Sequence, residues 1–309
     1  MTLCIGEIFG LHSQQLQATL NLEPGSARIE VQCLLQAVLK VNRAHLLAHP
    51  EQQLDAAQYA RYIALLERRS GGEPIAYLLG EREFYGLTFK VTPATLIPRP
   101  ETELLVDEAL RRVPSPPAGF APLAALSPQA REGGRQAGRG KGCRVLDLGT
   151  GGGAIALSIA HARRDSEVVA VDMSAAALEV AQINAQRLGL ANVRFLKSDW
   201  FSALHGEHFD IIVANPPYIV AGDAHLAQGD VRFEPVTALA SGTDGLDDIR
   251  RIAAQAKQHL NANGWLLLEH GYDQAAQVRA LLRQAGFAEV YSARDLAGIA
   301  RVSGGTGSA

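Results

Sequence analysis

The chain has 309 residues, of which 47% are hydrophobic and 20% are charged, and its formal net charge at pH 7 is −3. This length and apolar content suit a globular protein of one or two domains with a sizeable core. The acidic balance disfavours a protein that holds bare nucleic acid by charge alone, because neutralising phosphates requires a basic surface. We therefore expect no direct nucleic-acid partner.

The cysteines and the hydropathy pattern indicate a reducing compartment. Cys4, Cys33 and Cys143 are odd in number and lack Cys-x-x-Cys spacing, which disfavours a disulfide framework and a zinc knuckle. The first residues lack a basic stretch followed by an apolar core, and no apolar run approaches the roughly 20 residues of a membrane span. We expect a cytoplasmic, monomeric protein with no membrane partner.

Residues 1–75 are predicted to form a small helical domain. Apolar residues recur there at helical spacing in two stretches, Val31, Leu34, Leu35 and Val38, and then Tyr59, Tyr62, Ile63 and Leu66. Gly71 and Gly72 interrupt the pattern. Such a domain either recognises a partner or packs against its neighbour, and the pattern leaves both open.

Residues 76–100 are predicted to form a connecting β-hairpin. The period changes to two between Tyr77 and Pro100, where Leu87 and Phe89 alternate with Thr88 and Lys90. The hairpin closes in the sequence Ile-Pro-Arg-Pro-Glu-Thr over residues 97–102, which we call the strap. Its prolines fix an extended path, and Pro100 is placed to begin the next helix. A segment this stiff can form one wall of a site.

Strands and helices alternate through most of the remaining domain, residues 101–309. Residues 114–142 come first, rich in Pro, Ala, Gly, Ser and Arg without an apolar period, and are predicted to be a flexible surface loop whose arginines either are solvated or contact RNA. Strands are then predicted over 144–148, 167–171, 193–196, 211–214 and 265–269, with helices over 154–160 and 175–188. A terminal hairpin is expected from 290–291 and 299–302. This order predicts an α/β fold with a mainly parallel sheet.

A glycine-rich loop at Gly149–Gly153 joins the first of these strands to a helix. Glycines let the backbone approach a ligand closely, and the helix start offers free N–H groups. Gly149, Gly151 and Ala154 also satisfy the dinucleotide fingerprint, with Asp172 at the end of the next strand. The loop alone therefore fits a nicotinamide cofactor and S-adenosylmethionine equally well.

Polar residues at the neighbouring strand ends favour S-adenosylmethionine. Asp147 puts a carboxylate where it suits an ammonium group and would repel a pyrophosphate. Asp199 can accept from the adenine amino group and Trp200 can cover the base. Each also has a structural explanation, because Asp147 and Asp172 can cap a turn and a helix, and Asp199 and Trp200 can be loop and core. The ordered set, completed by Asn215 below, favours the cofactor role.

The sequence Asn215-Pro216-Pro217-Tyr218 follows the apolar run 209–214, at the strand end where open α/β sheets bind ligands. An asparagine amide beside two prolines and a tyrosine ring is a poor acid, base or metal ligand. It suits the binding of another planar amide or amino group. An adenine amine and a glutamine amide both fit.

These motifs resemble those of class I S-adenosylmethionine methyltransferases of the Asn-Pro-Pro-Tyr type, and within them the PrmC/HemK family of release factor glutamine methyltransferases. The similar segments run in family order across nearly the whole chain, at 72–78, 95–103, 147–151, 198–204, 215–219 and 228–235. Pro100 in the strap matches the release factor branch, because the related ribosomal-protein glutamine methyltransferases typically have Ser there. Two departures are the long 114–142 loop and Gly152, where Thr or Ser is frequent.

The resemblance implies a Rossmann-like sheet of seven strands, S-adenosylmethionine as cofactor and class I peptide chain release factors as substrates. The methylated group would be the side-chain amide nitrogen of the glutamine in their Gly-Gly-Gln motif. The implied cofactor-binding residues are Asp147, Gly149, Thr150, Gly151, Gly152, Gly153, Asp172, Asp199, Trp200 and Asn215. The implied catalytic and substrate-binding residues are Asn215, Pro216, Pro217 and Tyr218. Arg99 and Arg232 are left outside this set, because a structural ion pair explains them equally well.

Four alternatives remain at this point. They are an amino-adenine DNA or RNA methyltransferase, a ribosomal-protein glutamine methyltransferase, a partner-binding module on a methyltransferase scaffold, and a dinucleotide-dependent oxidoreductase that is not a methyltransferase. No metal is expected, because the pairs His45/His49 and His205/His208 lack an evident third ligand.

Overall fold

The computed structural model describes residues 3–113 and 142–307, so the expectation of a flexible loop at 114–142 falls almost wholly outside the described residues. The described chain forms two compact units. The first comprises the residues up to Arg82 together with Val91–Pro93 and Ala224–Glu234. The second comprises Glu83–Lys90, the described part of Ala94–Asp223, and the residues from Pro235 onward. Domain boundaries at residues 75 and 100 stay a prediction.

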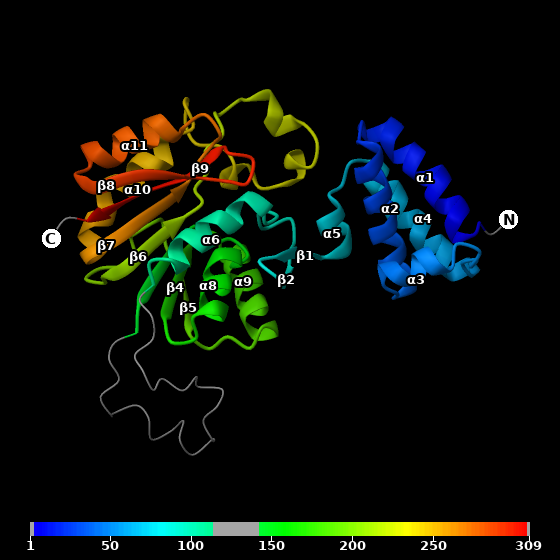
Figure 1. The fold of residues 1–309 in the computed structure, drawn as a ribbon, viewed down its shortest axis with the longest axis horizontal. Helices are drawn as coiled ribbons and strands as arrows, with labels where there is room; N and C mark the ends of the chain where they lie inside the picture. The colour runs from blue at the N-terminus through cyan, green and yellow to red at the C-terminus, as the bar shows by residue number, and fades with distance from the viewer. Residues whose placement is uncertain (1–2, 114–141, 308–309) are drawn as a thin grey trace, which may run out of the picture. The chain divides into compact units, whose positions relative to one another are not determined.

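Helices make up most of the first unit (Figure 1). They are α1 (Ile5–Leu20), α2 (Pro24–Leu39), α3 (Arg43–Ala48), α4 (Ala56–Ser70) and α5 (Ile75–Leu79), followed late in the chain by the short 3-10 turns η3 (Ala224–Ala227) and η4 (Val231–Phe233). Local signals set the helix starts: Pro24 is at the beginning of α2, and Asp55 caps α4 in a reciprocal pair with Gln58. Apolar faces of α1, α2 and α4 bury one core that includes Leu16, Leu34 and Tyr62.

A buried arginine organises the C-terminal end of α4. The Arg69 side chain is 3% exposed and donates two hydrogen bonds to the Glu30 carboxylate, at 2.6 and 2.9 Å. It also donates to the Gly72 carbonyl and, at 2.9 Å, to Asp230. Asp230 lies in the late segment Ala224–Glu234, so this guanidinium joins that segment to the helices of the first unit.

The second unit is built on a sheet that has seven strands within the described residues (Figure 1). In space the strands follow the order β5, β4, β3, β6, β7, β9, β8, and β5 to β7 are parallel while β9 is antiparallel to both its neighbours. Their bounds are β3 (Arg144–Leu148), β4 (Glu167–Asp172), β5 (Val193–Lys197), β6 (Phe209–Ala214), β7 (Leu260–Glu269), β8 (Phe287–Arg294) and β9 (Ala300–Gly307). The predicted α/β class and the terminal antiparallel hairpin are confirmed.

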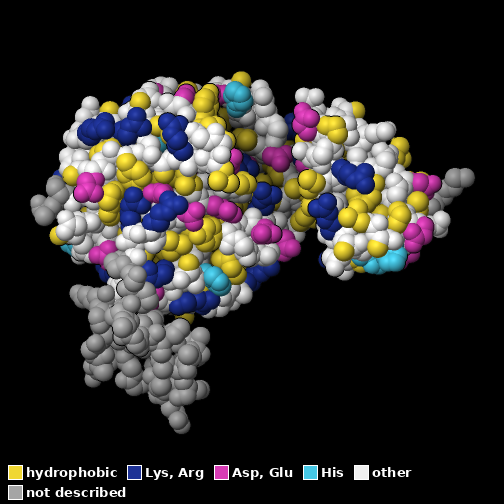
Figure 2. Space-filling model, viewed as in Figure 1, with side chains coloured by type: hydrophobic (Ala, Val, Ile, Leu, Met, Phe, Trp, Pro, Cys, Tyr) yellow, Lys and Arg dark blue, Asp and Glu magenta, His cyan; other side chains and the backbone are white. Residues whose placement is uncertain are grey.

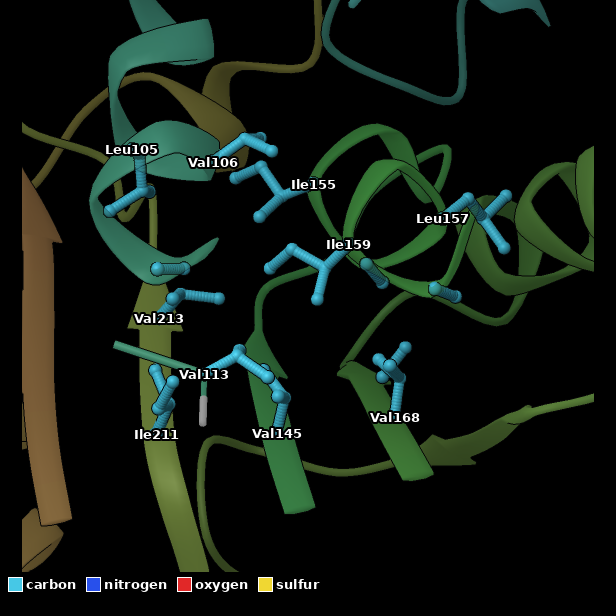
Figure 3. Close-up of a cluster of buried hydrophobic side chains, with 14 of the residues drawn as sticks. Leu105, Val106, Val113, Val145, Ile155, Leu157, Ile159, Val168, Ile211 and Val213 are labelled. Carbon is cyan, nitrogen blue, oxygen red and sulfur yellow. The ribbon is translucent and has the colours of Figure 1, made fainter. Parts of the chain in front are cut away.

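Helices cover both faces of this sheet. The helical elements of the second unit are η1 (Pro100–Thr102), α6 (Glu103–Leu110), α8 (Ala154–Ala162), α9 (Ala175–Arg187), η5 (Val236–Ala238), α10 (Asp247–Ala256), η6 (Lys257–His259) and α11 (Ala275–Gln284). Figure 3 shows Val145, Val168 and Ile211 of the central strands facing Ile155 and Ile159 of α8. The alternate residues of the same strands pack in a second buried cluster with α10 and α11. Strands buried on both faces are continuous apolar runs, which explains their clear sequence signal.

Strand order reverses between β3 and β6. The chain proceeds from β3 to β4 and β5 on one side, and then returns to place β6 on the other side of β3. The connections that follow the carboxyl ends of β3 and β6 lead to opposite sides of the sheet and leave a crevice between them. This crevice is where open α/β sheets bind ligands. The loops after β3 and β6 therefore meet at the natural binding position of the fold.

The connecting hairpin is shorter than predicted. Its strands are β1 (Glu81–Phe84) and β2 (Leu87–Lys90), and helix α5 takes up the beginning of the range read as period two. Tyr85 and Gly86 both have positive φ, as the tight two-residue turn of a hairpin requires. Asn184 of α9 accepts from the Lys90 amide at 2.7 Å and donates to its carbonyl, which anchors β2 in the second unit.

The described helices include none that is long and apolar enough to cross a membrane.

The two adjacent arginines of α4 provide a test of how the first unit is stabilised. Arg69→Met leaves Glu30 without its buried cationic partner and is expected to lower the free energy of unfolding by about 3 kcal/mol. Arg68 is 53% exposed and pairs with Glu73, so Arg68→Met is expected to cost less than about 1 kcal/mol. Methionine and arginine have similar helix propensity, which makes the pair matched. Urea denaturation measures both values, and equal losses would contradict the burial argument.

Candidate functional site

A cavity of about 360 Å³ lies at the carboxyl edge of the sheet, within the second unit. Loops after four successive parallel strands line it: Gly149 and Gly151 after β3, Asp172–Ser174 after β4, Asp199 and Trp200 after β5, and Asn215 and Pro217 after β6. Its size is in the range of small-molecule and cofactor sites, about 300–1,000 Å³. The sequence motifs on separate strands are thus brought together around one space.

The glycine loop divides into residues that face the cavity and residues that support the turn. Gly149 and Gly151 line the cavity, and a side chain on Gly151 would meet nothing within 4 Å. Thr150 is buried, its amide donates to the Val171 carbonyl, and its hydroxyl donates to Asp147 at 2.7 Å. Gly153 is the N-cap of α8. Thr150 and Gly153 therefore support the turn, whereas the backbone of Gly151 is accessible from the cavity.

Asp147 is a fully buried carboxylate with an unused oxygen. Its Oδ2 accepts from the Thr150 hydroxyl and, at 3.1 Å, from the Ala156 amide, whereas Oδ1 has no partner among the described residues. Burial raises the pKa of Asp147 to about 7, and the nearby Asp172 carboxylate adds to the increase. An interior carboxylate oxygen without a donor is costly, and a cationic ligand group can satisfy it.

Asp172 is held by backbone donors at the end of β4. One carboxylate oxygen accepts from the Gly151 amide and the other from the Ser174 amide, both at 2.8 Å. Burial raises the pKa of Asp172, and these backbone hydrogen bonds oppose the increase. A carboxylate fixed in this way keeps further lone pairs to accept from hydroxyl groups of a ligand in the cavity.

Asp199 and Trp200 have hydrogen-bond partners on α10 that the sequence did not indicate. The Asp199 carboxylate is 54% exposed and accepts from Arg251 of α10 at 2.8 and 3.0 Å. The Trp200 ring lies against the glycine turn, because a Cβ on Gly149 would come within 3.3 Å of it. The indole N–H donates to Asp248 at 3.3 Å. Asp199 and Trp200 both line the cavity, together with the Arg251 and Asp248 that hold them.

Asn215 lies at the edge of the cavity with its amide group engaged on one side. Its Nδ2 atom donates to the Thr102 hydroxyl at 3.3 Å, which directs the strap onto the Asn-Pro-Pro-Tyr loop. Pro217 lines the cavity and Pro216 is buried. Burial raises the pKa of the Tyr218 hydroxyl, and its backbone carbonyl accepts from Gln274 at 3.0 Å. The loop is thus held at both its ends.

Several lining residues were missed by the sequence reasoning. They include Thr95 and Leu96 just before the strap, Met173 after β4, and Thr237, Ala238 and Arg251 from the segment between β6 and β7. None belongs to a glycine-rich or strand-end motif, and the last three lie far from β3 in sequence. Only the idea that the strap forms one wall pointed to this part of the cavity. Within the described residues, no group of three or more His, Cys, Asp and Glu side chains is arranged to hold a metal ion.

Comparisons with known proteins identify the family. A model described as "PrmC N-terminal domain" matches residues 13–80, and one described as "Methyltransferase domain" matches residues 139–289. A release factor glutamine methyltransferase of Bordetella pertussis is 51% identical over 92% of this chain and 96% of its own length. The chain belongs to the release factor glutamine methyltransferase family. The Escherichia coli member is 46% identical over 94% of both chains. The recognition made from the motifs is confirmed.

Similarity to solved structures extends to the fold. A methyltransferase from Pyrococcus furiosus has a TM-score of 0.50 at 17% identity, covering 81% of this chain and all of its own. The hMettl16 catalytic domain has a TM-score of 0.53 at 16% identity, covering 79% of this chain and 82% of its own. At such low identity these similarities support the methyltransferase fold alone.

Replacing either of two adjacent glycines in the glycine-rich loop by alanine is expected to affect the stability of the protein differently. Gly153 has φ +86°, and a Cβ there would lie 2.9 Å from Leu157, so Gly153→Ala is expected to cost about 1–3 kcal/mol of stability. Gly152 lacks a left-handed φ, and its Cβ would make ordinary contacts at 3.6 Å with Thr95. Gly152→Ala is therefore expected to be neutral or to stabilise by up to about 1 kcal/mol. Thermal unfolding of both variants distinguishes them, and similar losses would contradict this account.

Proposed function

We propose that this protein transfers a methyl group from S-adenosylmethionine to the side-chain amide nitrogen of the glutamine in the Gly-Gly-Gln motif of class I peptide chain release factors. The observation that carries the proposal is Asn215 at the edge of the cavity, with its Nδ2 atom bound to Thr102 and its Oδ1 atom left to accept, in a chain of this family. A planar substrate amide requires acceptors of this kind.

The cavity residues fit the proposed cofactor. The unpartnered oxygen of Asp147 suits the cofactor's ammonium group, and Asp172 retains lone pairs for ribose hydroxyls. Gly149 and Gly151 supply backbone that a ligand can approach closely. Asp199 and Trp200 would hold adenine, with Arg251 sharing the Asp199 carboxylate. When bound, S-adenosylmethionine supplies an electrophilic methyl group on a sulfonium.

An amide nitrogen is a weak nucleophile, because its lone pair is delocalised into the carbonyl. Positioning must therefore provide most of the rate enhancement. Asn215 Oδ1 and the Pro216 carbonyl would accept the two amide hydrogens, which orients the nitrogen and favours the positive charge that develops there. One such preorganised group is typically worth about 3 kcal/mol. Pro216 lacks an N–H and has a fixed φ, which helps to hold its carbonyl in place.

The proton of the methylated nitrogen needs no strong protein base. The N-methylated amide that first forms is cationic, and it is acidic enough to lose its proton to water. The described residues that line the cavity include no histidine or cysteine, so the local chemistry agrees with a positioning mechanism.

An amino-adenine methyltransferase is disfavoured among the alternatives. It would need a basic surface to hold nucleic acid, yet the chain carries 29 Lys and Arg against 32 Asp and Glu residues. On the face drawn in Figure 2, basic and acidic side chains are intermixed. The similarity to release factor glutamine methyltransferases extends over about nine-tenths of the chain and includes the helical N-terminal part. This favours a release factor over a ribosomal protein as the substrate.

Further assignments follow from the proposed substrate. We infer that the helical region, residues 1–75, recognises the release factor, and that the enzyme acts as a monomer. Because release factors work on the ribosome, we infer that the reaction takes place in the cytoplasm and requires no nucleic-acid or membrane partner.

A methyl-transfer assay tests the substrate assignment. Wild-type protein incubated with labelled S-adenosylmethionine is expected to label a purified release factor. It should label neither the same factor with its Gly-Gly-Gln glutamine changed to alanine nor duplex DNA. Label on both forms of the factor, or on DNA alone, contradicts the proposal.

Asn215→Ala tests the proposed role of Asn215 as an acceptor for the substrate amide. This variant is expected to bind S-adenosylmethionine with nearly unchanged affinity and to lose about 100-fold or more in turnover, since it removes one preorganised acceptor. Calorimetry and the methyl-transfer assay measure the two quantities separately. Turnover equal to that of the wild type would refute the mechanism.

The pH dependence of cofactor binding tests the role of Asp147. Its pKa of about 7 means that the carboxyl holds a proton at pH 6, and an ammonium ligand must displace that proton. Affinity is therefore expected to rise about tenfold per pH unit from pH 5.5 and to level off above pH 7. Asp147→Asn should weaken binding and flatten this slope, whereas Asp199→Asn should keep it. An unchanged slope in Asp147→Asn would assign the proton to another group.

A further inference from the structure

Asp248 is a carboxylate of the cavity wall to which the proposed mechanism gives no role of its own. It lies in the first turn of α10, it lines the cavity, and its side chain is 19% exposed. Asp247 in the same turn is 59% exposed and pairs with Arg250. An acidic residue at either position suits the start of a helix. The contacts of Asp248 therefore decide whether it does more than its neighbour.

One carboxylate oxygen of Asp248 holds the Trp200 side chain. Its Oδ1 atom accepts from the indole N–H at 3.3 Å, and the Arg251 guanidinium is 3.6 Å from the same atom. An indole N–H can only donate, so it needs an acceptor when the ring is partly buried. This bond fixes the ring beside Gly149, in the wall where adenine is proposed to bind.

The backbone of Trp200 has a conformation that a large side chain rarely adopts. Its φ is +47°, and among the described non-glycine residues with positive φ, Trp200 alone lines the cavity. The Ser198 hydroxyl donates to its carbonyl at 2.7 Å. Strain of this kind persists only where the surroundings impose it. The position of the ring thus depends on its contacts, and Asp248 provides a polar one.

The other carboxylate oxygen of Asp248 holds the chain beside the Asn-Pro-Pro-Tyr loop. The Ser241 side chain is buried, and its hydroxyl donates to Oδ2 at 2.8 Å and accepts from the Asp248 amide at 2.9 Å. The Ser241 amide in turn donates to the carbonyl of Ile219 at 2.9 Å. Ile219 follows Tyr218 directly. Ser241 is therefore one bond from the backbone that continues the loop.

We propose that Asp248 is a positioning residue whose two carboxylate oxygens join the Trp200 wall of the cofactor site to the backbone that supports the Asn-Pro-Pro-Tyr loop. This rests on the proposed function, because it concerns the same methyl transfer. Asp248 acts on the cofactor through Trp200 and on the substrate amide through Ser241. The two reactants must meet in a precise geometry, and one side chain with a bond to each half of the site helps to set it.

The numbers of donors and acceptors explain why a carboxylate is required at Asp248. Trp200 and Ser241 each present a hydrogen, and an ionised carboxylate has an acceptor for both. Asparagine has the same shape but only one acceptor oxygen. Its NH₂ group must face either the indole N–H or the buried hydroxyl, which leaves one donor without a partner. Asp248→Asn can therefore preserve one of the two connections but not both.

Calorimetric titration with S-adenosylmethionine tests the connection to the cofactor site. Asp248→Ala is expected to bind about 10-fold more weakly than the wild type, because the indole loses its acceptor. Asp247→Ala makes the same change in the same helical turn and is expected to stay within about twofold. Trp200→Phe removes the N–H, so Asp248→Ala should weaken binding little further in that background.

Tryptophan fluorescence reports directly on the Trp200 ring. The chain has two tryptophans, so Trp265→Phe leaves Trp200 as the sole emitter. In this background Asp248→Ala is expected to increase the quenching of the emission by acrylamide, whereas Asp247→Ala leaves it unchanged. A purely structural role for Asp248 in α10 would not alter the ring in this selective way.

Steady-state methylation of a release factor tests the connection to the substrate loop. Ser241→Ala is expected to lower kcat/KM for the factor about 10-fold, with S-adenosylmethionine affinity within about twofold of the wild type. Asp248→Ala should lower both quantities, and Asp248→Asn should recover only one of them.

Four results would each overturn the proposal. They are wild-type cofactor affinity in Asp248→Ala, an undiminished effect of that change in the Trp200→Phe background, full activity of Ser241→Ala, and recovery of both quantities by Asp248→Asn. Failure of the wild type to methylate the factor would instead refute the proposed function, whereas the titration and the fluorescence require no release factor.

Discussion

Burial of the central strands on both faces is the constraint on which the rest of this structure depends. Alternate residues of β3, β4 and β6 enter two separate cores, so these strands offer no surface on which polar chemistry can be placed. Functional side chains are consequently confined to the strand ends. Because the strands are parallel, those ends lie along one edge of the sheet, and the reversal of strand order between β3 and β6 opens the cavity there.

The same burial explains the unusual electrostatics at this edge. Asp147 near the end of β3 and Glu269 at the end of β7 are both interior carboxylates with one oxygen unpartnered among the described residues, and burial raises the pKa of each to about 7. Elsewhere the buried charge of Arg69 is matched by Glu30 and Asp230. The two buried carboxylate oxygens without a partner among the described residues thus both lie at this edge of the sheet, where local rules of stability give way to the requirements of a site.

The segment between β6 and β7 shows why chain order and compact units differ. Ile219 and Ala240 pair in a short bridge of the second unit, yet Ala224–Glu234 between them belongs to the first unit through Asp230 and Arg232. A single stretch of chain therefore follows the Asn-Pro-Pro-Tyr loop, joins the helical unit and returns to line the cavity with Thr237 and Ala238. Linear boundaries drawn from helical and strand periodicity have no means of assigning such a segment.

The fold class, the family and the main motifs could be predicted from the sequence, because each rests on residues that are close together in the chain. Buried parallel strands are continuous apolar runs, glycines mark the turn at Gly149–Gly153, and Asn215–Tyr218 immediately follows a strand. The hairpin was placed with less success, since short apolar runs such as that of α5 fit either period. The hydrogen-bond partners of those motifs could be identified only from the folded chain. The bonds from Arg251 to Asp199 and from Asn215 to Thr102 join residues that are 52 and 113 positions apart. Such contacts leave no periodic trace in a sequence, because they arise when separate strand ends are brought to one edge of the sheet.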